Sequence, residues 1–168
     1  SGELVVGDAT LASRRFVIAT GARSKLPRIP GLQEANPLTP ESFFELTDFP
    51  ESLAILGGGA VGCELAQVMA KLGTKVHLFE AQKSLLPAEE NFVSGPLQSS
   101  LERDGVLVHT GDRVERIEGG GTVVSQSGSY KCQKILVALG RQPNTEELCL
   151  SALGVKCDEF GHPLIDSK

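Results

Sequence analysis

The chain has 168 residues, of which 40% are hydrophobic, and it carries 16 basic against 21 acidic residues, a formal net charge of −5. This length fits one domain with its own core, and the acidic balance offers no basic surface for nucleic acid or an anionic membrane. No apolar run reaches the roughly 20 residues of a membrane-spanning helix, and the N-terminus has no signal-peptide pattern. We therefore expect a soluble, cytoplasmic protein.

The first 50 residues are interpreted as two strands and an irregular crossover. Residues 3–6 form one expected strand, and residues 15–19 form a second that leads into Thr20-Gly21-Ala22. Repeated prolines keep residues 23–50 extended, apart from a short helix expected at 40–46 with Thr39 as its N-cap.

A glycine cluster follows the next apolar run, and it fits the pattern G-x-G-x-x-G through Gly57, Gly59 and Gly62. Residues 53–56 read as a buried parallel strand. The helix after the cluster has an apolar stripe that ends before Gly73 and consists of Leu65, Val68, Met69 and Leu72. In a dinucleotide site the glycines permit a tight turn, close approach of the pyrophosphate, and close helix–strand packing. The phosphates then lie on the helix N-terminus.

The second strand of this unit, residues 75–80, ends in Glu80, which follows Gly62 by 18 residues. An acid at this position can bind both ribose hydroxyls of the adenosine, and it repels a 2′-phosphate. The motif therefore favours NAD over NADP. The alternative is a solvated carboxylate at a strand end.

The remaining residues predict a helix, a series of short strands and an irregular tail. The helix is expected at about 89–104, interrupted by Ser94-Gly95-Pro96 and ended by Gly105. Short strands are expected at 106–109, 113–117, 122–126, 129–131 and 134–138. Several of them form a β-meander, and the last, a continuous apolar run, returns to the parallel sheet. One helical turn is expected near 148–153. The fold class is thus α/β, a Rossmann-like doubly wound parallel sheet with a β-meander.

The cysteines show no metal-binding or disulfide pattern. Cys63, Cys132, Cys149 and Cys157 form no C-x-x-C pair, and no histidine or acid stands beside them at ligand spacing. We expect free thiols and no metal site.

Two segments outside this unit carry a family resemblance. Phe16-Val17-Ile18-Ala19-Thr20-Gly21-Ala22 resembles the first A-T-G segment of the FAD-dependent pyridine nucleotide-disulfide oxidoreductases, and the stretch from Ile135 to Thr145 resembles their second, continuing as G-R-x-P-N-T. The family includes dihydrolipoamide dehydrogenase, mercuric reductase and glutathione reductase. In it the NAD(P) domain interrupts the FAD domain. The resemblance therefore implies that residues 1–22 end the N-terminal part of an FAD domain, 23–50 cross over, 51–139 form the NAD domain, and 140–168 return into the FAD domain.

The resemblance also implies roles for individual residues. The pyrophosphate would be held by Gly57, Gly58, Gly59, Ala60, Val61 and Gly62. Glu64 and Gly140 would lie near the nicotinamide, Glu80 at the adenosine ribose and Val114 at the adenine, and Ala81 would also belong to the cofactor site. Arg141 would lie near the flavin boundary, with Thr20 and Gly21 facing the flavin.

Plainer interpretations remain open for some of these residues. Glu64 would then only complement the helix dipole, Val114 would be a core valine, and the Thr-Gly and Gly-Arg pairs would be simple turns. Ala60 stands where several members carry a bulky aromatic gate, and Lys83 is a single cation beside Glu80.

The resemblance implies an enzyme that passes electrons between NAD(H) and a redox disulfide through FAD, as in dihydrolipoamide dehydrogenase or mercuric reductase. The C-x-x-x-x-C pair is absent here, so we expect a piece of a longer, homodimeric enzyme with a dimerisation domain, inactive alone and without catalytic residues. The final substrate stays open. Alternatives are an NADH oxidase or ferredoxin reductase-type flavoenzyme without a redox disulfide, and a non-enzymatic NAD-sensing module.

Overall fold

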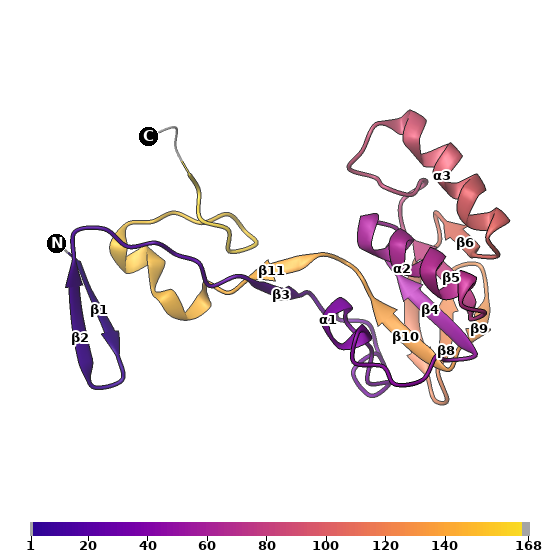
Figure 1. Ribbon diagram of the computed structural model, residues 1–168, viewed down its shortest axis with the longest axis horizontal. Coiled ribbons are helices and arrows are strands. Elements are labelled where there is room, and N and C mark those ends of the chain that lie inside the picture. The colour runs from indigo at the N-terminus through magenta and orange to yellow at the C-terminus, as the bar shows by residue number, and fades with distance from the viewer. Residues whose placement is uncertain (1, 166–168) are drawn as a thin grey trace. The chain divides into compact units, whose positions relative to one another are not determined.

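The computed structural model describes residues 2–165, and the chain divides into two units (Figure 1). The larger unit consists of residues 24–141, and the smaller one of residues 1–23 together with 142–168. Strands β3 (Ala22–Ser24) and β11 (Arg141–Pro143) pair with each other where the chain passes from one unit to the other.

A four-stranded parallel sheet organises the larger unit. Its strand order is β10-β4-β5-β6, and its members are β4 (Ser52–Leu56), β5 (Lys75–Glu80), β6 (Leu107–Thr110) and β10 (Lys134–Val137). The register aligns Leu56 with Phe79 on one side and with Val137 on the other. The predicted doubly wound sheet and the return of the last apolar run to it are confirmed.

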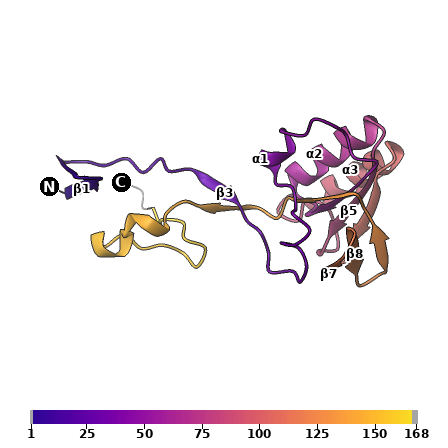
Figure 2. The same cartoon turned by 90° about the horizontal axis from the view of Figure 1, so that it is seen from below.

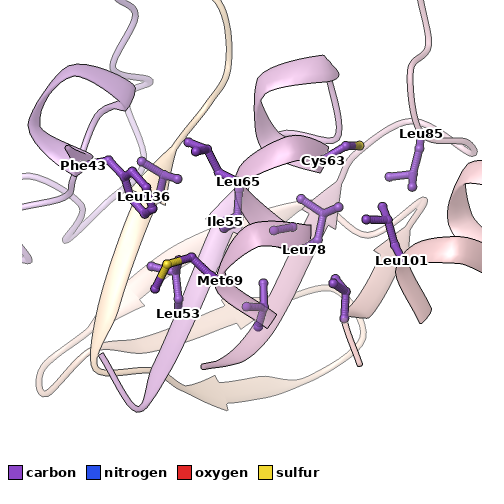
Figure 3. Close-up of a cluster of buried hydrophobic side chains, with 13 residues drawn as sticks. Phe43, Leu53, Ile55, Cys63, Leu65, Met69, Leu78, Leu85, Leu101 and Leu136 are labelled. Atoms are coloured by element: carbon purple, nitrogen blue, oxygen red, sulfur yellow. The ribbon is translucent and has the colours of Figure 1, made fainter. Parts of the chain in front are cut away.

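The two faces of this sheet have different covers (Figure 2). Helices α2 (Ala60–Lys71) and α3 (Asn91–Arg103) lie on one face, where alternate strand residues such as Leu53, Ile55 and Leu78 join the larger core cluster (Figure 3). The opposite strand residues, including Leu56, Phe79 and Val137, pack in a second cluster under the meander. Because side chains alternate along a strand, the sheet is buried on both faces.

Helix α2 buries Leu65 and Met69 of the predicted stripe, but not its other two members. Val68 and Leu72 are 48% and 51% exposed, whereas Cys63 and Ala66 are buried beside Met69. At 100° per residue, the inward side runs through positions 62, 63, 66 and 69, so Val68 and Leu72 point away from the sheet. The predicted stop is confirmed, since Gly73 follows the helix with φ of 93°.

Helix α3 begins later than predicted and continues through Pro96. Proline removes one backbone donor from the helix but does not end it here. The hydroxyl of Ser94 donates to the carbonyl of Leu85 at 2.5 Å, which fixes the first turns against the preceding loop.

The meander consists of β7 (Val114–Glu118), β8 (Thr122–Ser125) and β9 (Ser129–Lys131), in antiparallel order. A register shift between Val114 and Arg116 marks a bulge in β7. The meander was predicted, while β6 belongs to the parallel sheet.

The crossover contains a one-turn helix, α1 (Pro40–Phe43), shorter than the predicted 40–46. Its predicted cap is confirmed, since Thr39 accepts from the Ser42 N–H and the Ser42 hydroxyl accepts from the Thr39 N–H. Just before it, Leu38 forms a parallel bridge to Leu136, so the crossover lies beside β10.

The smaller unit contains a hairpin of β1 (Gly2–Val6) and β2 (Ala9–Ser13), and two 3-10 turns, η1 (Glu146–Leu148) and η2 (Leu150–Leu153). The strand predicted at 15–19 was wrong, because in the described chain β1 pairs with β2 and residues 15–19 join no ladder. Val17 is 91% exposed. This segment has the apolar pattern of a strand, but no strand among residues 2–165 pairs with it.

Candidate functional site

A cleft of about 340 Å³ opens in the larger unit at the carboxyl ends of the parallel strands. Ligands of open α/β sheets bind at this edge, where neighbouring strands connect in opposite directions. The lining comes from the crossover, the strand ends and the start of the meander: Pro27, Arg28, Ile29, Leu56, Gly57, Phe79, Ala81, Asp112, Arg113, Val114 and Leu139. The crossover thus forms one wall of the cleft.

The glycine loop between β4 and α2 is held tightly by its neighbours. Gly57 has φ of 115° and its N–H donates to the carbonyl of Phe79 at 2.8 Å. A Cβ at Gly62 would overlap the carbonyl oxygen of Gly57, and a Cβ at Gly57 would overlap that of Ala138. The fold itself therefore requires glycine at both positions.

Gly59 differs from these two positions. Its φ of −73° suits any residue, and within the described chain a Cβ there would meet no atom within 4 Å. Packing inside the protein thus gives no reason for glycine at 59. Glycine at position 59 would be explained by a ligand that approaches the backbone of the loop closely.

The N-terminus of α2 lies directly at this point. Gly59 is the N-cap and provides no side chain, and the first intrahelical bond runs from the Cys63 N–H to the Gly59 carbonyl at 3.0 Å. The N–H groups of Ala60, Val61 and Gly62 precede that bond, so the helix itself does not satisfy them. Free N–H groups and the helix dipole together favour an anion here.

Glu80 is attached to the glycine loop. Its side chain is buried, with 8% of the residue exposed, and Oε2 accepts from the Gly58 N–H at 2.8 Å while Oε1 accepts from the Gln82 N–H at 2.7 Å. A carboxylate oxygen can accept two hydrogen bonds, so each has capacity left for a ligand hydroxyl. The interpretation of Glu80 as a solvated strand-end acid was wrong, because these backbone donors hold it within the fold.

Ala81 and the adenine candidate Val114 line the same cleft as Gly57. Val114 is also part of the core cluster under the meander, so the core interpretation and the cleft interpretation both describe it. Asp112 lies next to them and is 5% exposed. Burial raises the pKa of Asp112, but hydrogen bonds from Ser127 and Ser125 outweigh it and bring that pKa below the ordinary value.

Of the candidates in the larger unit, the lining of the cleft includes Gly57, Ala81 and Val114, whereas the rest of the glycine loop and Glu80 are not part of it, and neither are the three described next. Glu64 is exposed in the first turns of α2. Gly140 has φ of 96° and its carbonyl accepts from the Lys25 N–H at 3.0 Å. Arg141 forms an ion pair with Glu41 at 3.8 Å.

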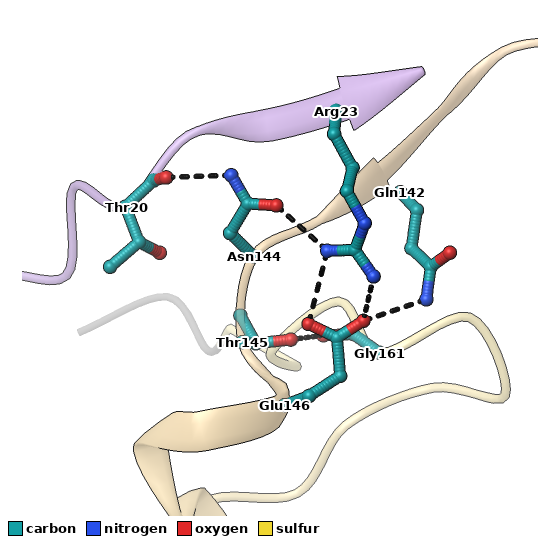
Figure 4. A network of polar contacts seen from close by, with 7 residues as sticks. All are labelled: Thr20, Arg23, Gln142, Asn144, Thr145, Glu146 and Gly161. Carbon is teal, nitrogen blue, oxygen red and sulfur yellow. Dashed lines mark hydrogen bonds and ion pairs between the residues drawn. The ribbon is translucent and has the colours of Figure 1, made fainter. Parts of the chain in front are cut away.

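Thr20 and Gly21 belong to the smaller unit, where Asn144 connects them to the second family segment (Figure 4). The Asn144 amide donates to the Thr20 carbonyl at 3.0 Å, and its backbone N–H donates to the Gly21 carbonyl at 3.0 Å. Arg23 donates to Asn144 Oδ1 at 2.8 Å and binds both carboxylate oxygens of Glu146. The A-T-G and P-N-T segments are therefore joined by side chains, and Thr20, Arg23 and Asn144 line a cavity of about 590 Å³.

The thiols show no sign of reactive chemistry near the loop. All of the cysteines are free, and burial, with smaller effects of Glu80 and Glu64, raises the pKa of Cys63 to about 11. A thiol protonated at neutral pH is a weak nucleophile.

Among residues 2–165, no group of three or more His, Cys, Asp or Glu side chains could hold a metal ion. No helix of the described residues is long and apolar enough to cross a membrane.

Comparison with known proteins identifies the family to which this chain belongs. The model of the pyridine nucleotide-disulphide oxidoreductases matches residues 2–168. The chain belongs to this family.

Among relatives of this oxidoreductase family, the mercuric reductase of Staphylococcus aureus is 35% identical over 95% of this chain and 30% of its own length. The dihydrolipoyl dehydrogenase of Bacillus subtilis is 39% identical over 71% of the chain and 27% of its own length. The solved structure of the HOCl-induced flavoprotein disulfide reductase RclA from Escherichia coli matches 96% of the chain, with a TM-score of 0.86, 31% identity and 38% of that protein covered. The chain thus spans about a third of these oxidoreductases.

Several cleft residues were not predicted from the sequence. Arg28 and Ile29 come from the crossover, and Asp112 and Arg113 come from the turn between β6 and β7. The signal that could have located Asp112 is its position just after a parallel strand, where the carboxyl ends of such strands meet. The crossover carries no comparable signal, because its place beside β10 depends on the Leu38 bridge.

Proposed function

We propose that this chain is the NAD(H)-binding part of a flavoprotein disulfide reductase, in which electrons pass between NAD(H) and a redox disulfide through FAD. The observation that carries the proposal is Gly59. A Cβ added at Gly59 would meet no atom of the described chain within 4 Å. The residue nevertheless lies at the N-terminus of α2, where a pyrophosphate would need both the open backbone and the free N–H groups.

The cleft would take the adenosine end of a dinucleotide, with Gly57 of the glycine loop in its lining. The pyrophosphate would lie on the loop formed by Gly57, Gly58, Gly59, Ala60, Val61 and Gly62. The adenosine ribose would hydrogen-bond to the remaining acceptor positions of Glu80, and the adenine would lie between Ala81 and Val114. Glu64 and Gly140 would lie towards the nicotinamide, which supplies or takes up the hydride.

The other candidates belong to the flavin side of the proposal. Arg141 would lie at the boundary with the flavin, and Thr20 and Gly21 would face it, held by Asn144. The redox cysteine pair and the dimerisation domain would belong to other parts of a homodimeric, cytoplasmic parent, and this chain alone would be inactive. A mercuric reductase-like and a dihydrolipoyl dehydrogenase-like substrate both agree with this proposal, because the substrate site would lie in other parts of the parent.

Preference for NAD over NADP follows from Glu80. The Gly58 and Gln82 N–H groups fix its carboxylate, so it cannot turn away from a 2′-phosphate, and the two negative charges would repel each other. Arg28 and Arg113 line the cleft and favour anionic ligands in general.

The test is calorimetric titration of NADH and NADPH into the wild-type chain and into Glu80→Ala. We expect NADH to bind at least about tenfold more tightly than NADPH in the wild type, and the preference to disappear in the variant. Glu89→Gln, which removes an exposed acid, is the matched control and should keep the preference. Equal affinities, or tighter NADPH, would contradict the assignment to NAD, and binding of neither dinucleotide would contradict the proposal.

A further inference from the structure

Asp112 is a buried carboxylate in a cleft that is otherwise largely apolar where the base would lie. It lines the cleft together with Ala81, Phe79 and Val114, and only 5% of the residue is exposed. Burying a charge is costly unless it is compensated, so a carboxylate at this place needs an explanation.

Hydrogen bonds from the meander compensate this charge and fix its position. Oδ2 accepts from the hydroxyls of Ser125, at 2.8 Å, and Ser127, and Oδ1 accepts from the Ser127 N–H at 3.1 Å. Ser127 is further held by Tyr130, whose hydroxyl lies 2.9 Å from the Ser127 hydroxyl. The carboxylate therefore cannot change its orientation without breaking several contacts.

The acceptor capacity of this carboxylate is used unequally. Oδ2 has two hydroxyl donors, whereas in the described chain Oδ1 has only the Ser127 N–H. An ionised carboxylate has about four acceptor positions and no donor. The serine hydrogen bonds keep the pKa of Asp112 below its ordinary value despite burial, so the group is an acceptor at neutral pH. Oδ1 thus retains one acceptor position for a ligand N–H.

A carboxylate that is fixed in place and can only accept hydrogen bonds can distinguish adenine from hypoxanthine. Adenine carries an exocyclic amino group, which donates, whereas hypoxanthine carries a carbonyl oxygen at the same ring position, which only accepts. Opposite a carboxylate, the carbonyl would leave two acceptors facing each other. Sites that lose a buried hydrogen bond in this way discriminate strongly.

We propose that Asp112 selects the adenine base of the bound dinucleotide by accepting a hydrogen bond from its exocyclic amino group at Oδ1. This inference rests on the proposed function and adds a specificity determinant to it. Asp112 acts on the base alone, so the choice between NAD and NADP stays with Glu80.

The test compares NADH with its deaminated analogue, nicotinamide hypoxanthine dinucleotide in reduced form, by calorimetric titration. The wild-type chain should bind NADH at least about tenfold more tightly than the analogue. In Asp112→Asn the side-chain amide can either donate or accept, so the two ligands should bind within about threefold of each other. The matched control is Glu115→Gln, which removes an exposed negative charge three positions further along the chain and outside the lining of the cleft. It should keep the wild-type ratio.

The ratio of the two affinities is the measured quantity, so a general loss of stability in Asp112→Asn does not imitate the expected result. A Ser127→Ala variant provides a second measurement, because it keeps the carboxylate and should keep a preference for NADH. A wild-type ratio near one, or a ratio unchanged in Asp112→Asn, would overturn the inference while leaving dinucleotide binding intact. Failure of both ligands to bind the wild type would overturn the proposed function, and the inference with it.

Discussion

The carboxylate of Glu80 accepts a hydrogen bond from the backbone N–H of Gly58 at 2.8 Å. The acid at the end of β5 and the glycine loop at the end of β4 are therefore parts of one structure even without a ligand. The Glu80 backbone carbonyl in turn accepts from the Asp112 N–H at 3.1 Å, which extends the connection to the turn before the meander. The residues assigned to pyrophosphate, ribose and adenine are thus positioned by each other.

We predict that Glu80→Gln lowers stability by about 1–3 kcal/mol, because glutamine has one side-chain oxygen for the two N–H groups that Glu80 now satisfies. One buried N–H would then face an amide NH₂ group. Urea unfolding measures the change, and Tyr130 is the natural probe, since the chain has one tyrosine and no tryptophan. The exposed Glu89→Gln is the control. If Glu80→Gln were as stable as Glu89→Gln, the hydrogen bonds of the Glu80 carboxylate would contribute nothing to the free energy of unfolding.

The glycine loop yields a contrast between two variants. Gly62→Ala should destabilise the larger unit by about 3 kcal/mol, because the new Cβ would overlap the Gly57 carbonyl and the helix would have to move from the strand. Gly59→Ala should change stability by less than about 1 kcal/mol, since φ is −73° and its Cβ meets no atom of the described chain within 4 Å.

Binding separates these variants further. Gly59→Ala should weaken NADH binding at least about tenfold although the protein stays folded, because the methyl group would stand where the pyrophosphate approaches. Urea unfolding and calorimetric titration on the same samples measure both quantities. If Gly59→Ala bound NADH as tightly as the wild type, the pyrophosphate could not lie on this loop.

The sequence predicted those parts of the fold that depend on local pattern. The bounds of β5 and β9 agree with the expected strands, and the Thr39 cap needs only neighbouring residues. The prediction from sequence was wrong at residues 15–19, because a strand also needs a partner strand, which the local pattern does not reveal. Asp112 was missed as a cleft residue because its partners, Ser125 and Ser127, follow 13 and 15 positions later. Such contacts depend on how the meander folds back.

A histidine pair predicts a dependence of stability on pH. His77 Nδ1 and His109 Nε2 lie 3.0 Å apart, and His109 stacks on Phe79 with ring centroids 4.6 Å apart. Burial, with smaller effects of His109 and Lys75, lowers the pKa of His77 to about 4. Because the unfolded value is about 6.5, the unfolded chain binds the proton first as the pH falls. Stability is therefore present above pH 6.5 and is lost progressively towards pH 4, by about 3 kcal/mol.

Urea unfolding between pH 7.5 and 4.5, followed by Tyr130 fluorescence, measures this loss. His77→Phe keeps an aromatic ring beside Tyr130 but cannot take up a proton, so its stability should fall less steeply below pH 6.5. His162→Gln, a change at an exposed histidine of the smaller unit, is the matched control. A wild-type slope in His77→Phe would assign the acid sensitivity to other groups.

The ion pair of Arg23 and Glu146 joins the two separate segments of the smaller unit, and it should be visible in the titration of Glu146. The hydrogen bond from Arg23, the largest cause, lowers the pKa of Glu146 to about 2. In Arg23→Gln that pKa should return towards the ordinary glutamate value near about 4.3, which carbon-detected NMR titration of the carboxyl group would measure. Both side chains are about half exposed, so stability at neutral pH should change little.

The matched control is Arg15→Gln, which removes an exposed arginine from the same unit and should leave the titration of Glu146 as it is in the wild type. If Glu146 titrated alike with and without the Arg23 guanidinium, the pair would not form in solution. Asn144, which accepts from Arg23 and donates to Thr20, would then be the side chain that still joins the two segments.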